Sequence, residues 1–183
     1  LLEYADMCED KEAVTKYTAV TRFFRAFFYF EKVKRFGDVP WYDIQLGSAD
    51  ELLYKPRDSR ELILTKMLED IDYAINSGGL TESAADPYHV NKWAALALKA
   101  QFCLYEGTYR KYHNLNLDGH DANFYLDLAA KAALEIIEKG PYKLYQTGHP
   151  EKDYLTLFAQ KDASPEEYIL AIKFDYAIGA RHN

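Results

Sequence analysis

The chain has 183 residues, of which 49% are hydrophobic and 28% are charged, with a formal net charge of -7. This length predicts one domain, residues 1–183, with a sizeable core. The acidic balance argues against a nucleic-acid-binding protein, which needs clustered Lys and Arg. No apolar run reaches the 18 residues that a membrane-spanning helix requires.

The first predicted helix is aromatic-rich, runs through residues 17–36 and ends at Gly37, with Pro40 beyond it. At about 3.6 residues per turn its apolar side chains form two adjacent stripes. One stripe comprises Ala19, Phe23, Ala26, Phe30 and Val33, and the other Tyr17, Val20, Phe24 and Phe27. A third stripe is polar and comprises Thr18, Arg22, Arg25, Tyr29 and Lys32. Two apolar faces predict burial on more than one side.

The second predicted helix begins with Asp58 as its N-cap and Glu61 in a capping box, and it ends at residues 76–79. Its apolar face comprises Leu64, Met67, Leu68, Ile71, Ala74 and Ile75. We interpret the acidic cluster Glu69, Asp70 and Asp72 as the solvated side of an amphipathic helix rather than as a cation site.

Two further helices are predicted over residues 91–107 and 123–139, the second stopping at Gly140 and Pro141. The three later helices start about 33 residues apart, close to a tetratricopeptide period. Each span holds one long helix and a loop, however, so the spacing supports only stacked antiparallel helices in an all-α fold.

Residues 168–174 read as a short β-strand, and no convincing second strand precedes them. The chain also opens at Leu1, without Met, inside what reads as a helix. We therefore expect the middle portion of a longer protein.

Four blocks in order resemble the RagB/SusD family. They are the first helix with residues 35–40 after it, residues 90–107, residues 128–144 and residues 154–171. Residues 19–21 depart from the family pattern, which commonly has an acidic residue and alanine before Arg22. The resemblance covers nearly the whole chain.

Membership would imply tetratricopeptide-like antiparallel helix pairs in a larger lipoprotein, held by an N-terminal lipid on the outer membrane of Bacteroidetes-type bacteria. Such a protein would bind oligosaccharides, or peptides in RagB-type members, and deliver them to a SusC-like TonB-dependent β-barrel transporter. Cys8 does not fit the lipidated cysteine, because no apolar signal region precedes it. The resemblance implies no cofactor.

The candidate binding residues lie mostly in the long aromatic connecting segments, which are more often functional than short ones. Glycan capture uses aromatic faces and a few polar groups in a preformed hollow. Trp41 and Tyr42, and Tyr88 and His89, fit this description. The favoured alternative is that Trp41 or Tyr88 packs over a helix end.

Residues 109–113, which include Tyr112, would either hold an anionic sugar or extend a helix whose cations complement its dipole. Asp118, Asp121 and Asn123 are a weak candidate for Ca²⁺, because they lack the alternation and terminal Glu of a calcium loop.

Catalysis has no sequence support: the chain contains no HExxH, GxSxG or phosphate-binding glycine loop. A helical protein-interaction scaffold is the remaining alternative.

Overall fold

The computed structural model describes residues 2–174 and 179, and these residues form helices joined by long segments. The described residues form five α-helices: α1 (Lys11–Phe36), α2 (Arg60–Asn76), α3 (Lys92–His113), α4 (Ala122–Lys139) and α5 (Pro150–Phe158). Two short 3₁₀ helices, η1 (Leu2–Met7) and η2 (Glu51–Tyr54), precede and follow α1. The predicted all-α fold is confirmed.

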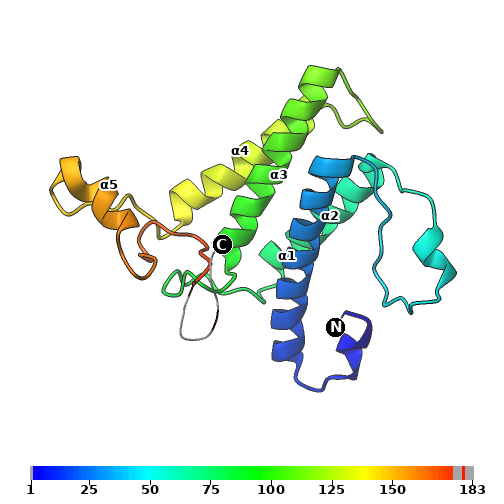
Figure 1. Cartoon of the computed structure of the whole chain (residues 1–183), viewed down its shortest axis with the longest axis horizontal. Coiled ribbons are helices and arrows are strands. Elements are labelled where there is room, and N and C mark those ends of the chain that lie inside the picture. Colours follow the sequence, from blue (N-terminus) through cyan, green and yellow to red (C-terminus); the bar gives the residue numbers. More distant parts are fainter. Residues whose placement is uncertain (1, 175–178, 180–183) are drawn as a thin grey trace.

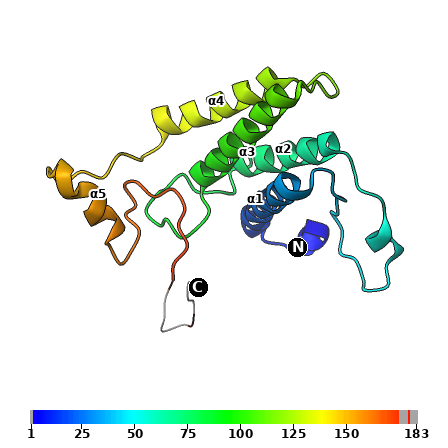
Figure 2. The same cartoon turned by 45° about the horizontal axis from the view of Figure 1, so that its top comes forward.

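The four long helices form two antiparallel pairs (Figure 1). Helix α1 packs against α2, α3 packs against α4, and α2 joins the pairs through its contact with α3. Figure 2 shows α3 and α4 on one side of α2 and α1 on the other side. Helix α5 is displaced beyond the end of α4. This is the tetratricopeptide-like arrangement of helix pairs.

One of the two apolar stripes of α1 builds the core, and the other remains exposed. Ala19, Phe23, Ala26, Phe30 and Val33 are buried, and the Phe30 ring meets that of Phe102 on α3 at 6.1 Å between ring centroids. In the second stripe Tyr17, Phe24 and Phe27 remain 54%, 51% and 45% exposed. The prediction of two-sided burial is therefore wrong for the described residues, because α2, α3 and η1 leave this side of α1 partly exposed.

Arg22 and Arg25 of the polar stripe face α2, where Arg25 forms an ion pair. Arg25 donates from Nε and Nη2 to the two carboxylate oxygens of Asp70, at 2.6 and 2.7 Å. Asp70 is 1% exposed, so the prediction that it lies on a solvated face is wrong. Its charge is tolerated because Arg25 neutralises it in a bidentate geometry.

A second buried ionic cluster joins α2 to α3. Glu106 accepts from Nη2 of Arg60 at 2.6 Å and from Nε of Arg110 at 2.8 Å. Arg110 also donates to Glu61, which is 2.6 Å from Nδ1 of His120. The two carboxylates and two guanidinium groups balance in charge, which permits burial between helices.

The N-cap of α2 is Ser59, whose side chain accepts from the backbone N of Leu62, and not Asp58 as predicted. Asp58 instead accepts from the backbone N of Trp41 at 2.7 Å. The capping-box partner Glu61 is also used differently, since it belongs to the buried ionic cluster. Both departures arise from partners that are distant in sequence.

Helix α3 continues past Gly107, its predicted end, to His113. Gly107 is needed for close packing, because a Cβ there would lie 2.7 Å from Cγ of Leu126 on α4. Residues 109–113 are thus a helical extension, and Arg110 is buried within it.

Residues 168–174 form no strand, contrary to prediction, and the described residues contain only isolated bridges. Within residues 2–174 there is no neighbouring strand with which the segment could pair. The segment is held instead by the backbone N of Ala171, which donates to Pro87 O at 2.8 Å.

Candidate ligand-binding site

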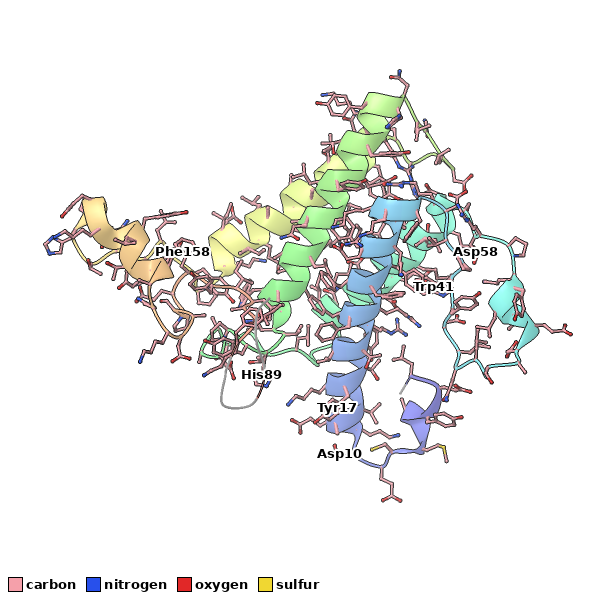
Figure 3. All side chains as sticks on the ribbon, in the orientation of Figure 1. Asp10, Tyr17, Trp41, Asp58, His89 and Phe158 are labelled. Carbon is pink, nitrogen blue, oxygen red and sulfur yellow. The ribbon has the colours of Figure 1, made fainter. Side chains whose placement is uncertain are left out.

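A hollow of about 860 Å³ lies between the first half of α1 and the segment that joins α2 to α3. We call it the groove. Figure 3 shows Tyr17 and His89 on these two walls. Its lining comprises Glu12, Thr15, Lys16, Tyr17, Val20, Phe24, Gly78, Gly79, Leu80, Thr81, Tyr88, His89 and Val90.

The floor of the groove depends on a close approach of backbone to backbone at Gly79. A Cβ at this position would lie 2.4 Å from the carbonyl oxygen of Thr15 and 3.0 Å from Cβ of Ala19. Only glycine permits that distance without displacement. Leu80, which follows, is 8% exposed and anchors the segment against the core.

The segment is then held by the start of α3. Asn91 caps the helix by accepting from the backbone N of Ala94 at 2.8 Å, and its amide donates to the hydroxyl of Tyr142. The indole Nε1 of Trp93 donates to Glu82 O at 2.8 Å. These bonds preform one wall of the groove, which lowers the ordering cost of binding.

Tyr88 and His89, both predicted from the sequence, lie in this wall. The Tyr88 hydroxyl donates to Asp162 and accepts from the backbone N of Ala163, so it also holds the later part of the chain. His89 is exposed, and its Nδ1 lies 2.7 Å from Oδ2 of Asp86. The pKa of Asp86 is lowered, first by the backbone N–H of Tyr88 and then by His89.

The opposite wall offers two half-exposed aromatic faces, Tyr17 and Phe24. Glu12, Lys16 and His89 add polar groups around them. Aromatic surface with a few polar groups at its edge is the arrangement that holds a sugar ring. Tyr17 and Phe24 were not predicted as groove residues, because their helical spacing indicated burial.

Trp41 lies in the core, with 7% of its surface exposed. Its ring stacks on Tyr29 at 4.3 Å between centroids, and the Arg25 guanidinium lies 4.9 Å from its centroid. These contacts give Trp41 a packing role, the alternative favoured from the sequence.

Tyr42 is half-buried beside a second, smaller hollow of about 340 Å³. This hollow is lined mainly by aromatic and apolar side chains, among them Phe28 and Phe36. The Tyr42 hydroxyl donates to Leu52 O at 2.9 Å and Lys55 lies over its ring, so the residue also fixes the segment around η2.

Tyr112 lies near the C-terminal end of α3, 82% exposed and outside both hollows. The structure thus separates the five sequence candidates and brings only Tyr88 and His89 into the groove.

The weak metal candidate gains no support from the geometry. Asp121 caps α4 by accepting from the backbone N of Phe124 at 2.9 Å, and Asp118 is in a left-handed conformation. Across residues 2–174, no group of three or more His, Cys, Asp or Glu side chains is placed to hold a metal ion.

No helix within the described part of the chain is both long and apolar enough to span a bilayer.

Comparison with known proteins gave no matching family model. A curated phenylalanine dehydrogenase of Bacillus thermotolerans is 37% identical over 73 residues, which is 40% of this chain and 19% of that protein. A match to so small a part of the dehydrogenase transfers no activity.

Solved structures give broader matches. A SusD-like protein from Bacteroides fragilis is 27% identical, with a TM-score of 0.67, over 91% of this chain and 28% of its own. A protein crystallised with a xylogluco-oligosaccharide is 22% identical, with a TM-score of 0.68, over 92% of this chain and 31% of its own. The chain thus spans about a third of the length of these proteins. Along nearly its whole length, the chain shares the fold of these proteins, one of which is SusD-like.

Proposed function

We propose that the protein binds oligosaccharides without catalysis, as the ligand-binding component of a glycan uptake system. The observation that carries the proposal is the groove, where Tyr17 and Phe24 on α1 face the segment of Tyr88 and His89. The xylogluco-oligosaccharide in the structure of one similar protein supports the choice of ligand class.

In this proposal, a sugar ring lies against Tyr17 or Phe24, and the polar groups at the groove's edge hold its hydroxyls. Both aromatic residues are on a 26-residue helix, whose other face is fixed in the core, so the platform is rigid. Glu12, Lys16 and His89 can accept or donate hydrogen bonds without any induced change in the backbone. The groove's volume lies within the range usual for small-molecule sites.

We further propose the cellular setting that the SusD-like fold suggests. The protein would be anchored by a lipid on the external face of the outer membrane and would pass its glycan to a SusC-like TonB-dependent transporter. Co-purification from a membrane preparation tests this part separately. Recovery of a TonB-dependent β-barrel supports it, and repeated recovery of the protein without one refutes it.

Calorimetric titration of the natural protein with neutral oligosaccharides, beginning with xylogluco-oligosaccharides, tests the binding. Tyr17→Ala and Phe24→Ala should each weaken binding about 3- to 10-fold, as expected for the loss of one aromatic contact. Tyr112→Ala is the matched control, because Tyr112 is exposed outside the groove and should leave the affinity unchanged.

Two results would contradict the proposal. Equal affinities for the wild-type protein and both groove variants would remove the groove from the binding site. A clear signal with a peptide panel and none with any glycan would replace the proposed function by peptide binding of the RagB type.

A further inference from the structure

The smaller hollow beside Tyr42, about 340 Å³ in volume, lies at the C-terminal end of α1 and shares no lining residue with the groove. One wall is the last part of α1, where Phe28 and Phe36 are 52% and 57% exposed. The turn after α1 and Arg57, which lies just before α2, complete the lining. The volume falls at the lower end of the range usual for small-molecule sites. We call it the second hollow.

Hydrogen bonds fix the walls of the second hollow before any ligand arrives. The Tyr29 hydroxyl accepts from the backbone N of Tyr42 at 2.7 Å, which ties the turn to α1. The backbone N of Asp58 donates to Val39 O at 3.2 Å, which holds the neighbouring Arg57 beside the same turn. A preformed hollow lowers the ordering cost of binding.

Two cations that line the second hollow, Lys32 and Arg57, form no ion pair within the described part of the chain. The ammonium of Lys32 lies 5.1 Å from the Phe28 ring centroid and 5.7 Å from that of Phe36. Arg57 is exposed, and its guanidinium keeps all its donors for a partner. The second hollow thus combines aromatic surface with uncompensated positive charge.

Among the described residues that line the second hollow, Asp38 alone carries a carboxylate. Its Oδ1 already accepts from the backbone N of Arg60 at 2.9 Å. Two cations and one carboxylate leave one net positive charge around an aromatic lining, in a chain whose overall charge is -7. Such surroundings favour a singly charged anion with an aromatic body.

We propose that the second hollow is a ligand site of its own and takes a small aromatic carboxylate. The aromatic ring lies against Phe28 and Phe36, and the carboxylate pairs with Lys32 and Arg57. Charge-assisted hydrogen bonds of this kind are roughly twice as strong as neutral ones, and a guanidinium can hold both carboxylate oxygens. The inference does not rest on the ligand proposed for the groove.

Other classes of ligand suit the second hollow less well. The hydroxyls of a neutral sugar need several acceptors, whereas the Tyr29 hydroxyl is engaged with Tyr42 and the Tyr42 hydroxyl donates to Leu52 O. A phosphate ester carries up to about two negative charges and would be repelled by Asp38. A single carboxylate on an aromatic ring matches both the lining and the charge.

Calorimetric titration of the natural protein with naphthoate tests the inference, with naphthamide as the uncharged analogue. Naphthoate should bind at least about 5-fold more tightly than naphthamide, and Arg57→Gln and Lys32→Gln should each weaken naphthoate binding about 3- to 10-fold. Lys34→Gln is the matched control and should leave the affinity unchanged, because Lys34 is exposed on α1, pairs with Glu31 and does not line the second hollow. Phe36→Ala should weaken both compounds by similar factors, because it removes ring contact and leaves both cations in place.

The inference fails if naphthoate shows no binding up to about 10 mM, binds no more tightly than naphthamide, or loses no affinity in either cation variant. It also fails if Tyr17→Ala weakens naphthoate binding, because the ligand would then lie in the groove. A loss of oligosaccharide binding in Tyr17→Ala with naphthoate binding unchanged supports two separate sites. The comparison of naphthoate with naphthamide needs no variant, so it decides the question even if a substitution disturbs the fold.

Discussion

Glu106 holds the two helix pairs together, and its replacement by Gln is the sharpest test of the buried ionic cluster. The side chain is inaccessible and accepts from Arg60 at 2.6 and 2.9 Å and from Arg110 at 2.8 Å. Gln preserves the shape but removes the negative charge, which leaves the cluster with one uncompensated cation. Breaking a buried ion pair in this way costs about 3–5 kcal/mol.

Urea unfolding of the wild-type and Glu106→Gln proteins, followed by circular dichroism, measures this loss. The matched control is Glu69→Gln, whose ion pair with Lys66 lies on the exposed side of α2. That change should cost less than about 1 kcal/mol. If the free energy of unfolding falls by similar amounts in the two variants, the cluster does not stabilise the contact between α2 and α3.

Three further predictions concern the groove floor, the cysteines and Asp58. Gly79→Ala should destabilise the protein by about 1–3 kcal/mol in urea unfolding. The control is Gly47→Ala, which should change the stability little, because a Cβ there meets nothing within 4 Å. Equal effects of the two substitutions would refute the close approach at Gly79. Burial raises the pKa of Cys103 to about 12. At pH 8 a thiol reagent should therefore modify only Cys8 in native protein and both cysteines in urea. A Cys103 that reacts rapidly in native protein would contradict its buried position. The Lys55 ammonium and the backbone N–H of Trp41 lower the pKa of Asp58, so its stabilising contribution is present above the ordinary value near 4 and is lost as the pH falls through the lowered one. The stability difference between wild-type and Asp58→Asn protein should accordingly shrink below about pH 4, and a difference independent of pH would refute the assignment.

Local sequence signals predicted the four long helices well because each carries its own period, whereas α5 was not predicted. The start of α3 was predicted near Asn91, whose side chain caps the helix as its type favours, and α4 begins one residue before its predicted start, with Asp121 as its cap. The missed extension of α3 has a simple cause. Gly107 has the residue type of a helix stop, but its role is set by Leu126 on another helix.

Pairings between distant residues explain the other departures. Asp70 has the spacing of a solvated residue, yet its partner Arg25 lies 45 positions earlier in the chain. Trp41 has the character of a loop aromatic, and its burial depends on Tyr29 and Arg25. Neither periodicity nor residue type reports such contacts.

Only one wall of the groove could be predicted from the sequence. Tyr88 and His89 stand in a long aromatic segment, which pointed to a binding role. Tyr17 and Phe24 carry the spacing of a buried stripe, and they are exposed only because no described element covers that side of α1.

The most direct test of the proposed function is a crystal structure of the natural protein with a bound xylogluco-oligosaccharide. A sugar ring should lie against Tyr17 or Phe24, with a hydroxyl within hydrogen-bond reach of His89, Glu12 or Lys16. An oligosaccharide bound elsewhere, with the groove filled by protein side chains, would contradict the account.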